Sequence, residues 1–91
     1  MASIRIRRRH TDNQDDARKK IEDAIGPQVA KFGLKKTWDG DTLKVSGKGV
    51  KGTLTVGDGD ININMKLGMP ASMFSSKIEN ELNSELNKAF G

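Results

Sequence analysis

The chain has 91 residues, of which 34% are apolar and 31% are charged, so it is long enough for one small domain, residues 1–91, with a single core. It has no cysteine, which excludes disulfide bonds, thiolate chemistry and zinc held by cysteines, and no apolar run approaches the roughly 20 residues of a membrane helix. The charged N-terminus is not followed by the apolar stretch of a secretory signal, so we expect a cytoplasmic protein.

A strand is predicted over residues 2–9. Ile4 and Ile6 alternate with arginines, and a period of two is typical of a strand with one buried face. Arg5, Arg7 and Arg9 then share the opposite, exposed face. The formal net charge is +4, and the arginines at positions 5, 7, 8 and 9 account for all of it, because residues 11–91 hold 12 basic and 12 acidic side chains.

A helix is predicted over about residues 12–32. Thr11 stands three residues before Gln14, which is the spacing of a capping box. Gly26-Pro27 should kink or break the helix, but the apolar stripe keeps its phase across them, so we expect one bent helix that ends at Gly33. The stripe consists of Ala17, Ile21, Ala24, Ile25, Val29 and Phe32.

Two hairpins follow the helix. Residues 34–38 and 41–45 are joined by Asp39-Gly40, and residues 50–56 and 60–67 by Asp58-Gly59, a pair that favours a two-residue turn. In the second hairpin, pairing residue 57 with residue 60 places every apolar side chain on one face, which fixes the register. In the first hairpin Lys36 falls in the apolar phase, so its turn could be longer than two residues.

A second helix is predicted over about residues 71–90, with Pro70 in its first turn. Its apolar residues repeat at every fourth position: Phe74, Ile78, Leu82, Leu86 and Phe90. The fold class is therefore α+β, a five-stranded antiparallel sheet in the order β-α-β-β-β-β-α with both helices packed on one face. The predicted shared core contains Leu54, Val56, Ile61 and Ile63 from the sheet and Phe74, Ile78 and Leu82 from the second helix.

Three motifs are interpreted as structural. The segment GKGVKG (47–52) matches a dinucleotide fingerprint in letters, but a strand follows it instead of a helix, so it is a hairpin loop. The segment starting at Asp58 has the alternating oxygens of a calcium loop but lacks its sixth-position glycine and twelfth-position glutamate. His10 is the only histidine, so we interpret it as a polar residue near a helix start, not as a metal ligand or base.

The sequence offers little for catalysis or for a cofactor, and we expect neither. Glu79, Glu81 and Glu85 are interpreted as a solvated helix face because nothing gathers them in a cleft. Three methionines could line an adaptable apolar pocket near Trp38, which would suit a carrier of small apolar ligands. Filling of the core is the use that we favour, because so small a chain has little volume to spare for a cavity. The three residues are Met65, Met69 and Met73.

Cations dominate the exposed face of the predicted sheet. Seven outward-facing side chains are cationic and none is acidic. Such a face should attract anions. The alternative is a merely solubilising surface. The proposed anion-binding residues are Arg5, Arg7, Arg9, Lys44, Lys51 and Lys66.

The segments SIRIRRRHT, ARKKIEDAI, FGLKKTWDGDTLKVSGKGVKGTLTV and FSSKIENELNSELNKAFG resemble the bacterial family of "putative polyhydroxyalkanoic acid system" proteins. The resemblance implies a non-enzymatic accessory protein linked to polyhydroxyalkanoate metabolism or storage granules, with the polyester granule surface or another protein as its partner. The family supplies no catalytic residues to carry over. The alternative function is a basic anion- or nucleic-acid-binding module, against which stands the lack of a predicted aromatic residue on the exposed face for base stacking.

Overall fold

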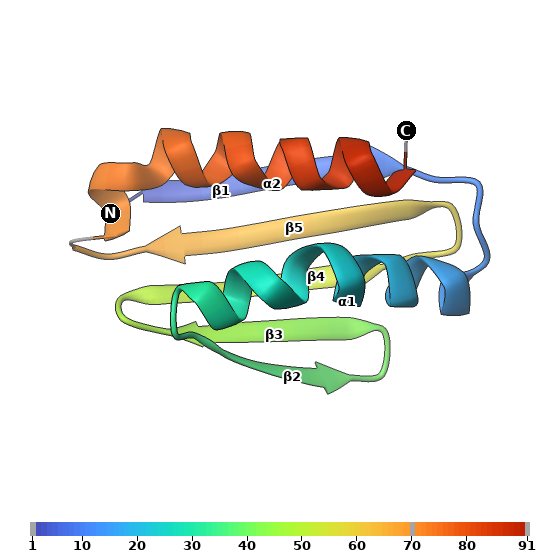
Figure 1. The fold of residues 1–91 in the computed structure, drawn as a ribbon, viewed down its shortest axis with the longest axis horizontal. Helices are drawn as coiled ribbons and strands as arrows, with labels where there is room; N and C mark the ends of the chain where they lie inside the picture. The colour runs from blue at the N-terminus through green and yellow to red at the C-terminus, as the bar shows by residue number, and fades with distance from the viewer. Residues whose placement is uncertain (1, 70, 91) are drawn as a thin grey trace.

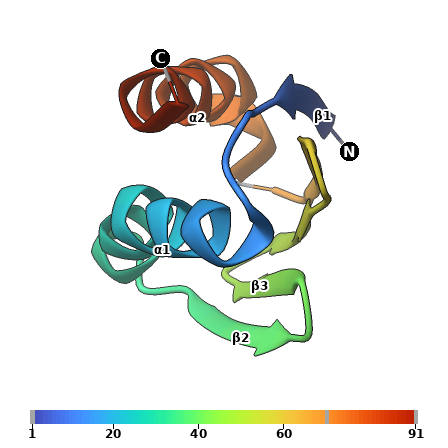
Figure 2. The same ribbon diagram turned by 90° about the vertical axis from the view of Figure 1, so that its right-hand side faces the viewer.

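The computed structural model describes residues 2–69 and 71–90, which contain five strands and two long helices. Figure 1 shows how these elements are arranged. The elements in chain order are β1 (Ala2–Arg9), α1 (Gln14–Lys31), β2 (Lys35–Asp39), β3 (Thr42–Gly47), β4 (Val50–Val56), β5 (Asp60–Leu67), the 3-10 turn η1 (Ala71–Phe74) and α2 (Ser75–Phe90). Seen along the sheet in Figure 2, both helices lie on the same face. The predicted α+β fold and element order are confirmed. No helix in the described ranges is long and apolar enough to span a membrane.

The sheet is antiparallel throughout, with strand order β1-β5-β4-β3-β2, so β1 and β2 form its edges. The predicted register of the β4–β5 hairpin is confirmed. Val56 pairs with Ile61 and Leu54 with Ile63, and all four side chains are buried on the helix side. The same alternation puts the neighbouring strand positions on the face that no helix covers, which we call the open face.

The β2–β3 hairpin differs from the prediction in its turn. Asp39 pairs with Thr42, so the two turn residues are Gly40-Asp41 instead of Asp39-Gly40, with φ 61° at Gly40. The loop is still only two residues long. Lys36 lies in the apolar phase of β2 because its Nζ reaches Glu22 Oε1 of α1 at 2.5 Å.

Helix α1 begins at Gln14, and the predicted capping box at Thr11 is wrong. The side chain of Asn13 accepts a hydrogen bond from the Asp16 amide at 2.8 Å and caps the helix instead. The Gln14 side chain donates to the Val56 carbonyl at 3.2 Å, so it ties the helix start to β4. The helix continues through Pro27 without a break, and Gly33 follows it at φ 68°, as predicted.

The start of the second helix also differs from the prediction. Residues 71–74 form a 3-10 turn and the α-helix starts only at Ser75, while Pro70 lies outside the described residues. Phe74 is 56% exposed, so its predicted place in the core is wrong, and Ile78 and Leu82 are half-buried. The fully buried residue of α2 is Leu86.

The core is divided into two clusters. The larger lies between α1, the C-terminal part of α2 and the central strands, and includes Ile21, Leu43 and Leu86. The smaller contains Ile4, Val50 and Leu67, with Ala71, Ile78 and Leu82 of the η1–α2 segment packed against it. Half-buried Ile6, Leu34, Met65 and Leu82 touch both clusters.

Candidate functional site

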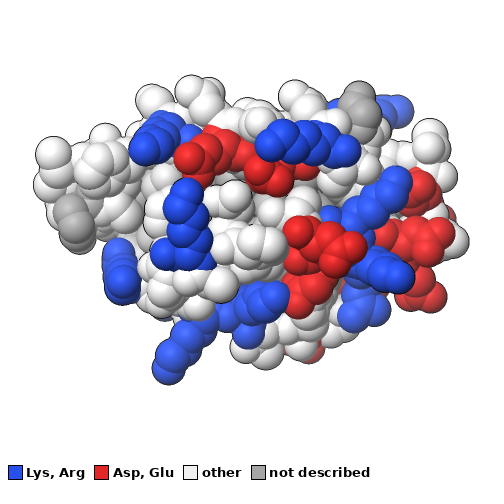
Figure 3. All heavy atoms as spheres, in the orientation of Figure 1, with Lys and Arg blue, Asp and Glu red and all other residues white. Residues whose placement is uncertain are grey.

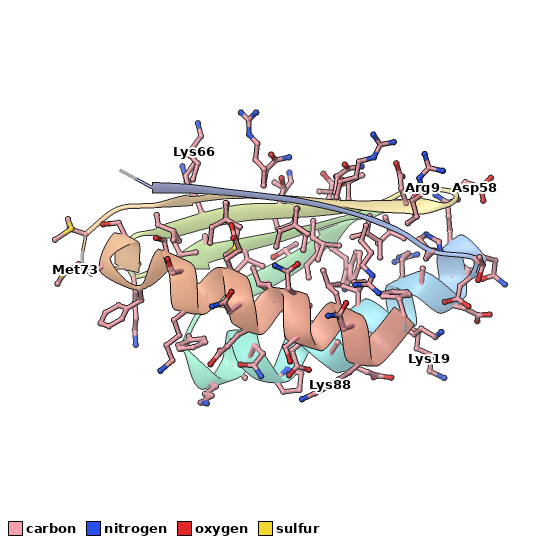
Figure 4. All side chains as sticks on the ribbon, turned by 90° about the horizontal axis from the view of Figure 1, so that it is seen from above. Arg9, Lys19, Asp58, Lys66, Met73 and Lys88 are labelled. Carbon is pink, nitrogen blue, oxygen red and sulfur yellow. The ribbon has the colours of Figure 1, made fainter. Side chains whose placement is uncertain are left out.

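The two faces of the molecule differ in how their charges are arranged. On the helix side, shown in Figure 3, basic side chains lie next to acidic ones, and Lys20 pairs with Asp12 and Lys88 with Glu85. Figure 4 shows the sheet from its edge, with Lys66 projecting from the open face, away from the helices. All six predicted anion-binding cations are exposed: Arg5, Arg7, Arg9, Lys44, Lys51 and Lys66.

Four of the six predicted cations surround one depression on the open face, with a volume of about 550 Å³. Lys51 stands directly opposite Lys66 across the β4–β5 ladder, and Arg5 faces Asn64 on the next strand. Lys44 completes the group from β3. We call Arg5, Lys44, Lys51 and Lys66 the cationic depression. Among the described residues, the side chains of Arg5, Lys51 and Lys66 form no ion pair.

The remaining two cations lie outside the depression. Arg7 Nη2 contacts Asp60 Oδ2 at 3.3 Å, and Arg9 stands opposite Asp60 in the β1–β5 ladder. Asp39 likewise reaches Lys44 at 3.3 Å. Carboxylates at the strand ends therefore pair with Arg7 and with Lys44 and offset part of the charge of the face. Arg8 turns to the helix side, where it donates to Asn87 of α2.

A second hollow lies on the helix side, between α1, α2 and the sheet, with a volume of about 390 Å³. We call it the interhelical cavity. Gly52 contributes to its floor at a position where β4 faces the helices, and a Cβ there would stand 2.9 Å from Met65 Cγ. The missing side chain lets Met65 lie across the floor and leaves the space above it unfilled. The wall residues include Ile25, Val29, Leu43, Leu54, Ile63, Ile78 and Leu82.

Aromatic and charged residues line the cavity at its edges. Phe32 and Phe74 are 44% and 56% exposed, although both line the cavity. Lys48 and Lys77, both exposed, and half-buried Glu81 also line it. The tip of the β3–β4 hairpin places Lys48 there in a left-handed conformation, with φ 49°. The GKGVKG segment is thus a hairpin loop, as predicted.

Both uses considered for the methionines, core filling and a pocket near Trp38, are wrong for Met69 and Met73, while Met65 packs against the core. Of the three methionines only Met65 lines the cavity, whereas Met69 and Met73 are 70% and 69% exposed. Trp38 packs instead beneath Arg18, whose guanidinium carbon lies 5.0 Å from its ring centroid, and donates to Glu22. The sequence signals for the cavity were the inward-facing glycine of β4 and the aromatic residues at the helix ends.

The other titratable residues have structural roles or lie apart from one another. His10 is buried, its Nε2 lies 3.0 Å from the Gly57 carbonyl, and its ring stands 5.8 Å from Phe90. Glu79 is exposed, while Glu85 lies 3.5 Å from Lys88. Within residues 2–69 and 71–90, no three His, Asp or Glu side chains converge as a metal site would require.

Comparison with known proteins gives one result. The sequence model of a family described as "putative polyhydroxyalkanoic acid system protein" matches residues 4–90, nearly the whole chain. Searches of curated proteins and of solved structures found no significant match.

Proposed function

Because the chain belongs to the family of polyhydroxyalkanoic acid system proteins, we propose that it is a non-enzymatic, cytoplasmic accessory protein that contacts polyester storage granules through its surface. The observation that carries this proposal is a group of large apolar side chains exposed at one end of the molecule. We call Phe32, Met69, Met73 and Phe74 the apolar end; they are 44%, 70%, 69% and 56% exposed. Figure 4 shows Met73 at this extremity, where the chain enters α2.

The residues of the apolar end lie close together, unlike the single exposed apolar residues that are common on protein surfaces. Phe32 lies at the end of α1 and Phe74 just before the start of α2, and both line the same cavity. Met73 is adjacent to Phe74 in sequence. The Ser72 hydroxyl donates a hydrogen bond to the Met69 sulfur at 2.9 Å. A contiguous apolar patch on a small protein marks an interaction surface. A polyester is largely apolar, and covering the patch with it would contribute about 25 cal/mol for each Å² removed from water. Lys48 and Lys77 border the patch and can keep their ammonium groups in water.

Sedimentation with washed polyhydroxyalkanoate particles tests this proposal. We expect the wild-type protein to pellet with the particles and the variant Met69→Gln/Met73→Gln/Phe74→Gln to stay in the supernatant. The matched control is Arg5→Gln/Lys51→Gln/Lys66→Gln, which changes as many exposed residues on the open face and should pellet like wild type. Equal pelleting of both variants, or a wild type that does not pellet, contradicts the proposal. Fractionation of granule-producing and non-producing cells extends the test to the cell.

A second candidate function rests on the cationic depression. Three of its four cations lack an ion pair within the described part of the chain, and Lys51 and Lys66 face each other without an intervening carboxylate. We propose as the alternative that this surface binds polyanions, such as nucleic acid or an anionic membrane, without sequence preference. Binding should weaken as salt rises, because it releases condensed counterions.

Titration of a fluorescent DNA duplex and of anionic vesicles tests the alternative. The variant Arg5→Gln/Lys51→Gln/Lys66→Gln should lose most of the binding, whereas Arg8→Gln should lose little because Arg8 contacts α2. The apolar-end variant should bind polyanions normally. If wild type binds neither polyanion at low salt, the open face is only a solubilising surface.

A further inference from the structure

We infer that the interhelical cavity binds a single aliphatic chain that ends in a carboxylate. The cavity adjoins the granule contact proposed above and shares Phe32 and Phe74 with it, but its ligand is a free small molecule taken from solution.

The walls of the cavity suit an aliphatic chain. They come from α1, from the sheet and from the η1–α2 segment, and most of them are branched aliphatic side chains such as Ile25, Val45 and Ile78. The volume of about 390 Å³ falls in the range of small-molecule sites. A cavity with this lining gives a water molecule few hydrogen-bond partners, so an apolar ligand can enter without displacing well-bound water.

The charged groups at the cavity favour an anionic head group. Lys48 and Lys77 line it against a single carboxylate, that of Glu81, which leaves one positive charge in excess. An aliphatic chain within the cavity can extend its carboxylate toward the lysines that line it. Lysine is an adequate point-charge partner for such an anion.

The tight turn between β3 and β4 determines where Lys48 stands. The φ of 49° at Lys48 is unfavourable for a residue with a Cβ, and the glycines on either side take up the rest of the turn. Asparagine or glycine would fit this position more easily, yet lysine occupies it at the cavity. The two-residue turn between Gly47 and Val50 itself requires a positive φ at Lys48. A structural benefit exists as well, because the Lys48 ammonium lies near Gly33, at the negative end of α1.

One polar group in the cavity allows two kinds of aliphatic carboxylate, a hydroxyalkanoate and an ordinary fatty acid, to be distinguished. Gln28 lines the cavity, and its Oε1 is buried without a hydrogen-bond partner in the described residues. A ligand hydroxyl could donate to this oxygen once the side chain turns to it. A free hydroxyalkanoate, the monomer of the polyester in the family description, carries such a hydroxyl, whereas an ordinary fatty acid does not.

Calorimetric titration with hexanoate, octanoate and decanoate, each below its micelle concentration, tests the apolar part. We expect saturable binding of one ligand per chain, tightening about fourfold for each added methylene until the cavity is full. Ile78→Trp, which places a ring in the cavity, should abolish binding while the circular dichroism spectrum is kept. Absence of saturable binding to wild type at any chain length would overturn the inference.

The head-group argument is tested by paired variants and paired ligands. Lys48→Asn/Lys77→Gln should weaken octanoate binding about two- to fivefold for each lysine and leave 1-octanol binding unchanged. Asparagine tolerates the left-handed backbone at position 48. The matched control is Lys19→Gln/Lys88→Gln, which removes two lysines that do not line the cavity; Figure 4 shows Lys19 at the end of the molecule away from Met73. An equal loss in both double variants, or an equal loss for octanol, refutes a carboxylate site.

Two further outcomes are informative. If 3-hydroxydecanoate binds more tightly than decanoate and Gln28→Leu removes the difference, the ligand is a hydroxyalkanoate; equal affinities support an ordinary fatty acid. If wild type is a dimer at the titration concentration and binds no ligand, a second copy covers the cavity and the inference is wrong. Because these titrations contain no granules, their failure leaves the sedimentation result unaffected, and the reverse also holds.

Discussion

The helices α1 and α2 meet at one end of their layer and separate at the other. At the closed end Leu86 packs with Ala17 and Ile21, all fully buried, and Lys20 lies over the Phe90 ring at 5.4 Å. At the open end the two helices leave the interhelical cavity between them. Its aromatic residues Phe32 and Phe74 remain about half exposed.

The difference shows what an apolar stripe does and does not specify. Helix α2 and the turn before it carry an apolar residue at every fourth position, but these residues differ in burial. Phe74 is exposed, Ile78 and Leu82 are half-buried, Leu86 is fully buried, and Phe90 at the helix end is half-buried again. The repeat determines which side of the helix faces the protein. The depth of each residue depends on how closely the neighbouring helix approaches. Both proposed contacts with apolar partners lie at the end where packing is incomplete.

Truncation at the closed end should have the largest effect on stability. Leu86→Ala removes a side chain that is 0% exposed, and we expect the free energy of unfolding to fall by about 2–5 kcal/mol. Chemical denaturation followed by circular dichroism measures this loss. A loss below about 0.5 kcal/mol, the range of ordinary surface changes, would mean that α2 packs elsewhere.

Midway along α2 the same change should matter less. Leu82 is half-buried and borders the cavity, so Leu82→Ala removes fewer contacts and should cost about 1–2 kcal/mol. Measured beside Leu86→Ala under identical conditions, it should be clearly the milder variant. A loss equal to that of Leu86→Ala would indicate that the helices close over the cavity in solution.

The ion pair between Glu22 of α1 and Lys36 of β2 allows a test of stability at a place away from the contact between the two helices. The hydrogen bond from Lys36 lowers the pKa of Glu22 below its ordinary value of 4.5, with burial opposing and the charge of Lys36 assisting. Because the pKa of Glu22 is lower in the folded state than in the unfolded chain, the Glu22–Lys36 pair stabilises the fold above the unfolded-state pKa. This stabilisation is lost as the pH falls through the folded-state pKa. The stability difference between wild type and Lys36→Met should therefore shrink below about pH 4.5. A difference that is constant from pH 7 to pH 3 would contradict this assignment.

The smallest effect is expected at the open end. Phe74→Gln alters a side chain that is 56% exposed, and the free energy of unfolding should change by less than about 0.5 kcal/mol. Thermal unfolding of this variant beside Leu86→Ala gives the full contrast between the two ends. A loss of 2 kcal/mol or more, which is typical of a buried aromatic residue, would place Phe74 in the core after all.

Local rules were sufficient to predict much of the sheet. The Asp58-Gly59 turn and the alternation of apolar residues in β4 and β5 require the same pairing, so that register followed from the sequence. The β2–β3 turn was harder, since a glycine stood in both candidate turns and Lys36 obscured the alternation. Only the position of Glu22, fourteen residues earlier in the chain, explains why a lysine faces the helices.

The cationic open face and the interhelical cavity also differ in how far the sequence predicts them. The positions of the cationic residues were predictable because strand alternation alone decides which side chains reach the open face. The cavity was not, because its width depends on the separation of two helices that are distant in sequence. Met69 and Met73 were expected near Trp38, but both are exposed, Met73 within the turn at 71–74.

The two edges of the sheet have a consequence for the protein when it is crowded. Unpaired backbone groups on an edge strand are templates for adding another strand, the step by which sheets grow into fibrils. Here β1 carries four arginines, and β2 carries Lys35 and the inward-pointing Lys36. Edge-to-edge approach of two copies brings these like charges together. Copies packed densely, as the proposed granule contact would require, repel one another at their edges. Salt that shortens the screening length below about 10 Å would weaken that protection.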